Sequence, residues 1–141
     1  MSEGVEERRA ARIGTVSGLA LLVGGTAIAA AAGDAHSVFA TVLLGLLTLG
    51  MAHALLDEIR RQARREVGYW GAHDTANTVL LASWSVIALI GTGLAVAPAE
   101  IRAVGLTLSL GYAVCCAYFV IERRRTVTSA GTRASQDHPS L

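Results

Sequence analysis

The sequence lacks lysine altogether and carries few charged residues of any kind, 16% of 141. A soluble domain usually has about a quarter charged residues. The shortage is uneven, because the charges gather in residues 3–12, 57–74, 100–102 and from 122 onward. The stretches between these clusters are close to the roughly 20 residues with which a helix crosses a hydrocarbon core. The pattern excludes an ordinary soluble domain and predicts a membrane protein.

Cysteine is scarce as well, and Cys115 and Cys116 are adjacent. Two neighbouring cysteines form no disulfide framework and no CxxC motif. Consecutive residues on a helix point in different directions, so we interpret both as small packing residues. A lipidated or metal-binding pair is the alternative.

Motifs for catalysis are missing. The sequence contains no GxSxG, no HExxH and no glycine-rich phosphate loop outside the apolar stretches. No carboxylate lies within an apolar stretch, which argues against a small proton-coupled exporter. The basic clusters all adjoin apolar stretches, so a nucleic-acid partner is not expected. We predict a protein that is not an enzyme and needs no cofactor.

The apolar stretches predict an all-α integral membrane four-helix bundle made of two helical hairpins. This single domain covers residues 1–125, followed by a disordered tail over 126–141. Similar segments in the two halves, LLVGGTAIA and LIGTGLAVA, indicate a weak parallel repeat, although composition alone also produces such similarity. The four helices are predicted at residues 13–32, 38–56, 75–97 and 103–121.

The first stretch resembles a signal peptide in its preceding arginines and its AIAAAAG segment. Its length of about 20 residues exceeds the usual 7–15 of such a segment. Acidic residues also precede it. Cleavage of residues 1–32 is therefore the alternative, and we interpret the stretch as a membrane helix.

Arginine placement predicts the orientation. Eleven of the twelve arginines fall on one side of a four-span arrangement, and Arg102 alone falls on the other. Cytoplasmic loops hold an excess of basic residues. We therefore predict a multi-pass protein of the cell membrane with both termini in the cytoplasm.

The long connection between the second and third spans looks helical. Ile59, Ala63, Val67 and Trp70 recur at helical spacing. This predicts a cytoplasmic helix over 57–70, followed by a new helix with Asp74 or Thr75 as its N-cap. The connection serves either as a topology anchor or as a contact with the membrane surface or a partner. The predicted contact residues are Arg60, Arg61, Arg64, Arg65 and Trp70.

Small residues predict where helices approach closely. Gly14, Gly18, Gly25 and Ala29 share one face of the first helix and include a literal GxxxG. We call this set the small-residue face. A second row at four-residue steps contains Gly105 and Ser109. These rows predict a compact bundle with one face left for self-association.

His53 is the only ionisable side chain inside a predicted span. An intramembrane histidine is a candidate functional residue. With His73 it is the one pair that could hold a metal or haem. The competing interpretation, which we favour, is a neutral His53 hydrogen-bonded to a neighbouring span.

Taken together, these features predict a non-catalytic accessory subunit or a self-associating membrane scaffold. Its partners are the lipid bilayer and either a second copy or another membrane protein. The alternative is a small oligomeric transporter or channel. The hydroxyls available to line such a pore belong to Thr48, Ser83, Ser85, Thr92, Thr107 and Ser109.

Overall fold

The computed structural model describes residues 3–32, 38–65, 68–93 and 98–136. These residues form four helices and no strand. Each helix is long and apolar enough to cross a membrane. The predicted all-helical fold with four candidate spans is therefore confirmed. The helices are α1 (Glu3–Ala31), α2 (Val38–Ala63), α3 (Ala72–Gly93) and α4 (Ala99–Gln136).

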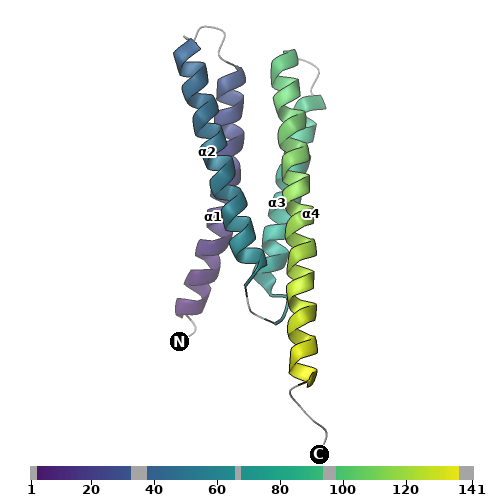
Figure 1. The fold of residues 1–141 in the computed structure, drawn as a ribbon. Coiled ribbons are helices and arrows are strands. Elements are labelled where there is room, and N and C mark those ends of the chain that lie inside the picture. Colours follow the sequence, from purple (N-terminus) through teal and green to yellow (C-terminus); the bar gives the residue numbers. More distant parts are fainter. Residues whose placement is uncertain (1–2, 33–37, 66–67, 94–97, 137–141) are drawn as a thin grey trace, which may run out of the picture.

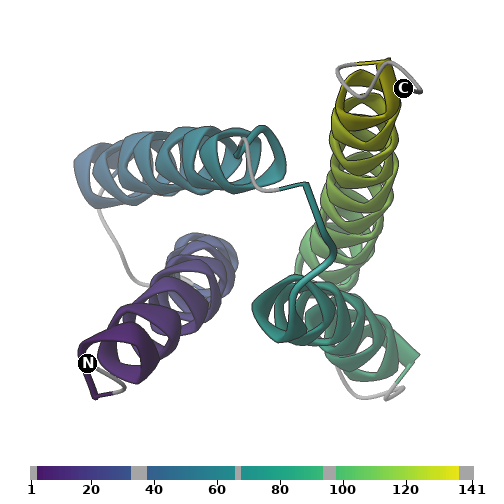
Figure 2. The same cartoon turned by 90° about the horizontal axis from the view of Figure 1, so that it is seen from below.

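The helices pack side by side in two pairs. α1 lies along α2 and α3 lies along α4, and the pairs meet near the α2–α3 connection (Figure 1). From there α2 and α4 diverge toward the opposite end of the molecule, and the end-on view shows them separated (Figure 2). Both termini lie at the same end as the α2–α3 connection.

The core is a narrow stripe of residues drawn from every helix. α1 contributes Val16, Ala20 and Val23, and the remaining buried apolar residues belong to the other three helices. Large apolar side chains such as Leu46 and Leu49 are instead exposed on the outer surface. A soluble protein rarely exposes so much contiguous apolar surface. The arrangement suits a protein that uses lipid as its outer solvent.

α2 ends at Ala63, so the predicted helix over 57–70 is too long at its C-terminal end. Arg64 forms a turn, and Arg65 has already left the helix. The physical reason is tertiary, because α4 donates hydrogen bonds to the backbone carbonyls of Arg65 and Tyr69. Those carbonyls accept hydrogen bonds from α4 instead of from backbone N–H groups of a longer α2.

α4 continues to Gln136, so the prediction of a disordered tail from residue 126 is wrong for residues 126–136. The α2–α3 connection packs against this extension. A Cβ atom placed on Gly68 would lie 3.2 Å from the Cβ of Ala130. Thr126 also donates a hydrogen bond to the carbonyl of Ala63 (3.4 Å). Residues 137–141 of the predicted tail lie outside the described residues.

The glycines of the small-residue face are not closely packed against another helix in the described part of the chain. A Cβ atom on Gly14, Gly18 or Gly25 would meet nothing within 4 Å, and Ala29 is exposed. α1 instead buries the opposite face, where valine and alanine side chains give more packing contact than glycine. Close approach occurs at other glycines, Gly24 beside the Tyr112 hydroxyl and Gly105 beside Thr92. Self-association through the small-residue face stays a prediction.

Candidate functional site

The first turn of α3 is closed by an aspartate that reaches backwards. Gly71 donates its backbone N–H to Asp74 Oδ2 (2.9 Å), and its own carbonyl accepts from the N–H of Asp74 (2.9 Å). Gly71 is therefore the N-cap, and Asp74 is the acidic third residue of a capping box. The predicted N-cap at Asp74 or Thr75 is wrong by three to four residues. The carboxylate also faces the positive end of the helix dipole.

Arg123 of α4 binds this aspartate from the other side. Both side chains are completely buried, with Arg123 Nε 3.0 Å from Asp74 Oδ2. The two terminal nitrogens of Arg123 donate to the carbonyls of Arg65 and Tyr69, each at 2.8 Å. One guanidinium thus joins α4 to the start of α3 and to the α2–α3 connection.

Sequence reasoning assigned Arg123 to the membrane-flanking charges and missed its role. A signal was present in the spacing along α4. Tyr112, Phe119 and Arg123 recur at intervals of seven and four, so Arg123 shares a helix face with two residues that the structure buries. The adjacent Arg124 and Arg125 are exposed.

The second oxygen of Asp74 is also occupied. Its Oδ1 lies 3.1 Å from His73 Nε2 and 3.4 Å from Arg65 Nη2, and Arg65 also contacts the His73 ring. We call Arg65, His73, Asp74 and Arg123 the Arg123 cluster. Arg65 was predicted to contact the membrane surface or a partner, and in the structure its side chain is turned inward toward Asp74 with 18% exposed.

A second set of buried polar side chains links α3 to α2. Asn77 Nδ2 donates to Gln62 Oε1 (2.6 Å), and Gln62 Nε2 donates to Glu58 Oε1 (2.5 Å). Glu58 also pairs with Arg61. Asn77 Oδ1 has no hydrogen-bond partner within the described part of the chain. The hydrogen bond between Asn77 and Gln62 ties α3 to α2.

The two candidate histidines, His53 and His73, lie beside different carboxylates. His53 is 76% exposed, and its Nδ1 lies 3.2 Å from Oδ2 of Asp57 on the same helix. The expected hydrogen bond from His53 to a neighbouring span is therefore wrong, because residue 53 is on the outward face of α2. His73 belongs to the Arg123 cluster. Among the described residues no group of three or more histidine, cysteine, aspartate or glutamate side chains could hold a metal ion.

Three of the predicted surface arginines face outward but have acidic neighbours. Arg60 lies 3.8 Å from Asp57, and Arg64 Nε lies 3.2 Å from Glu122 of α4. Arg61 pairs with Glu58. Trp70, the fifth predicted contact residue, is partly exposed and donates its indole N–H to Thr75 Oγ1 (2.8 Å). The basic charge of the connection is largely balanced within the protein.

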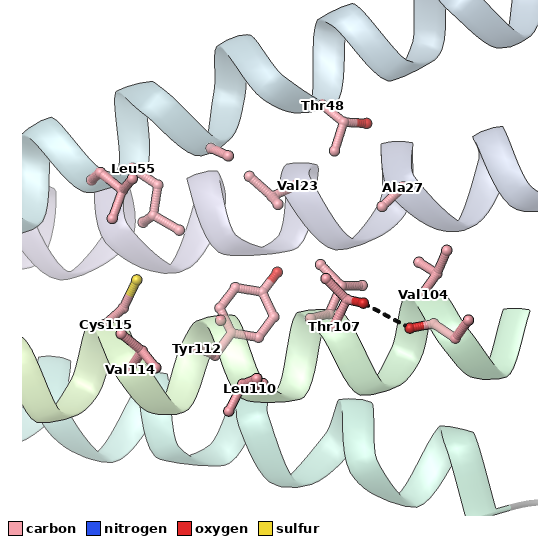
Figure 3. Close-up of a pocket in the computed structure, with 15 residues that line it drawn as sticks. Val23, Ala27, Thr48, Leu55, Val104, Thr107, Leu110, Tyr112, Val114 and Cys115 are labelled. Carbon is pink, nitrogen blue, oxygen red and sulfur yellow. Dashed lines mark hydrogen bonds between the residues drawn. The ribbon is translucent and has the colours of Figure 1, made fainter.

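An apolar groove lies between the diverging helices α2 and α4, with α1 behind it (Figure 3). Its volume is about 730 Å³, within the range of ligand pockets. Tyr112 crosses the groove floor and donates its hydroxyl to the carbonyl of Ala20 in α1 (2.6 Å). We call this apolar groove the α2–α4 groove. Residues that line it include Val23, Ala27, Thr48, Leu55, Val104 and Cys115.

The hydroxyls considered for a pore have different partners in the structure. Thr48 of α2 donates to Thr26 Oγ1 of α1 (3.0 Å), while Ser85 of α3 donates to the carbonyl of Ser109 in α4 (2.8 Å). Thr107 bonds to Ala103 of its own helix, as the dashed line in Figure 3 marks. These hydroxyls do not form one continuous polar row.

Comparisons of the chain with family models, curated proteins and solved structures gave no match. The site therefore has to be interpreted from its own geometry. That geometry combines a polar junction at one end of the molecule with an apolar groove along the part that is long enough to span a membrane.

Proposed function

We propose that this chain is a non-catalytic, multi-pass protein of the cell membrane that acts by self-association. In this arrangement α1–α2 and α3–α4 are two helical hairpins, and both termini are cytoplasmic. Support for the orientation comes from the arginines, because eleven of twelve belong to segments at the end that carries both termini.

One observation carries the proposal of self-association. A Cβ atom on any glycine of the small-residue face would meet no described atom within 4 Å, although glycine-rich faces suit close helix contact in lipid. The same chain also has an unfilled apolar surface, the α2–α4 groove. We therefore propose a second copy of this chain as the occupant of the groove, with its α1 as the inserted helix.

The depths of the two surfaces agree. The hydrogen bond between Tyr112 and the Ala20 carbonyl places these residues at one level. The groove extends along α4 from Ala103 to Cys115, about 18 Å of helix, and the small-residue face spans about 22 Å around Ala20. Copies with the same orientation in one membrane present both surfaces at the same depth. Such a head-to-tail contact closes into a ring or continues as a chain.

Bulky substitutions on each surface test the proposal. Gly25→Leu blocks the small-residue face and Gly111→Leu fills the groove, and the Cβ atom of either leucine would meet nothing within 4 Å. We expect the wild type to be an oligomer in mild detergent by light scattering, and each variant to be a single chain. Gly50→Leu is the matched control, because Gly50 also has nothing within 4 Å and does not line the groove.

Other outcomes assign different functions. A monomeric wild type in detergent and in liposomes would contradict self-association. A second polypeptide that co-purifies in fixed ratio, and is lost in Gly111→Leu, would identify an accessory subunit instead. Solute flux in liposomes by a pure oligomer would favour the transporter or channel.

A further inference from the structure

A second cavity lies at the end of the molecule that carries the termini, between the α2–α3 connection and the extension of α4. Its volume is about 430 Å³, and its lining residues are Trp70, Arg124, Val127 and Thr128. The contact between Gly68 and Ala130 holds the connection against α4 beside it. The cavity therefore has one wall from each of two packed segments.

Among the arginines near this cavity, one lines the cavity and has no ion pair with a described carboxylate. Arg60, Arg61 and Arg64 each have a carboxylate neighbour, and Asp74 binds Arg65 and Arg123. No ion pair within the described part of the chain involves Arg124 or Arg125. Of these last two, Arg124 lines the cavity and Arg125 does not. The cavity thus contains a positive charge that no described carboxylate balances.

The other lining groups suit a lipid rather than a soluble ion. The Trp70 indole is held in place by its hydrogen bond to Thr75, and Trp residues are typical of the membrane–water boundary. Val127 adds an apolar wall, while the Thr128 hydroxyl is engaged with the Arg124 carbonyl (3.0 Å). Arg124 is therefore the cationic donor of the site, beside surfaces that can pack against a glycerol backbone.

We propose that this cavity binds the phosphate of an anionic membrane phospholipid through Arg124, with Trp70 and Val127 against the lipid's glycerol region. A guanidinium matches the geometry of phosphate oxygens. Basic pockets beside spanning helices are typical headgroup sites. The proposal rests on the membrane placement proposed above, but it does not depend on self-association.

Two arginine variants test the site in lipid nanodiscs. The full chain is reconstituted in phosphatidylcholine with or without phosphatidylglycerol, and the retained phosphatidylglycerol is measured by native mass spectrometry after release. We expect Arg124→Gln to weaken phosphatidylglycerol binding about five-fold, the effect of one basic residue near a membrane surface. Arg125→Gln should leave binding within about two-fold, although it removes the same charge from the next residue of the same helix.

The outcomes separate the alternatives. Equal losses in both variants would overturn the site, because the attraction would then come from general charge. No loss in either variant would also overturn it, because binding would then not need Arg124. Binding of inorganic phosphate alone, lost in Arg124→Gln, would assign the cavity to a soluble phosphate and overturn the lipid source. A chain that fails to enter nanodiscs would instead contradict the membrane placement.

Discussion

At the scale of single residues, Arg123 shows that position on the helix, more than residue type, decides whether a side chain is buried. Three consecutive arginines follow the apolar part of α4, yet Arg123 is completely buried while Arg124 and Arg125 are exposed. A buried guanidinium is tolerated only when it is paired and its donors are satisfied. Asp74 and two backbone carbonyls meet that requirement for Arg123.

Replacement of Arg123 should therefore destabilise the fold strongly. Arg123→Met leaves Asp74 without its main partner, and breaking a buried pair of this kind costs about 3–5 kcal/mol. Arg123→Lys should cost less, because it keeps the charge but cannot reach all three acceptors. Unfolding by denaturant in detergent micelles would measure both changes.

Arg64→Met is the control for that series. The Arg64 side chain is 67% exposed and pairs with Glu122, so its loss should change stability by about 0–1 kcal/mol. Similar losses for Arg123→Met and Arg64→Met would contradict a special role for Arg123.

At the scale of helices, the packing of α3 on α4 includes one especially close approach. Gly105 lies against the Thr92 side chain. A Cβ atom added at Gly105 would also lie 3.4 Å from the carbonyl oxygen of Ala88. Thr92 is buried and already donates a hydrogen bond to Ala88, so its side chain has little freedom to move away. Glycine here permits a contact that no other residue would.

A single added methyl group should therefore disturb the α3–α4 contact. We expect Gly105→Ala to lower the free energy of unfolding by about 1–3 kcal/mol relative to Gly45→Ala. Gly45 lies within α2 and has nothing within 4 Å of its Cβ position. Thermal unfolding of the two variants in the same detergent gives the comparison. Equal stability would mean that α3 and α4 are not so closely packed.

At the scale of the whole molecule, both termini and the arginine-rich segments lie at one end. Moving guanidinium groups across a bilayer is costly, so this end is the one expected to stay in the cytoplasm. The polar Arg123 cluster lies at the same end, because it joins the start of α3 to the α2–α3 connection.

Reporter fusions test this orientation. A reporter that is active only outside the cytoplasm should be inactive after residue 125 and active at residue 35, between α1 and α2. The opposite pattern would contradict the proposed orientation, and activity at both positions would contradict an even number of spans. Fusion at residue 102 provides a further outside position as an internal control.

The sequence by itself predicts the helices and their apolar character, because both depend on composition along a continuous stretch. Bilayer thickness sets the length of such a stretch, and four of them are visible without any contact information. The sequence also indicated candidate surface arginines, but it did not indicate the carboxylates that lie beside them. Helix ends were the weakest part, as the N-cap at Gly71 and the extension of α4 to Gln136 show.

Only the tertiary structure decided which of these residues meet. Asp74 and Arg123 are 49 positions apart, and Gly68 packs against Ala130 from a similarly distant segment. Pairings of this kind depend on how the helices cross, which local patterns do not specify. For the same reason the structure, and not the GxxxG pattern, shows that α1 buries Val16, Ala20 and Val23, while a Cβ atom on Gly14, Gly18 or Gly25 would meet nothing within 4 Å.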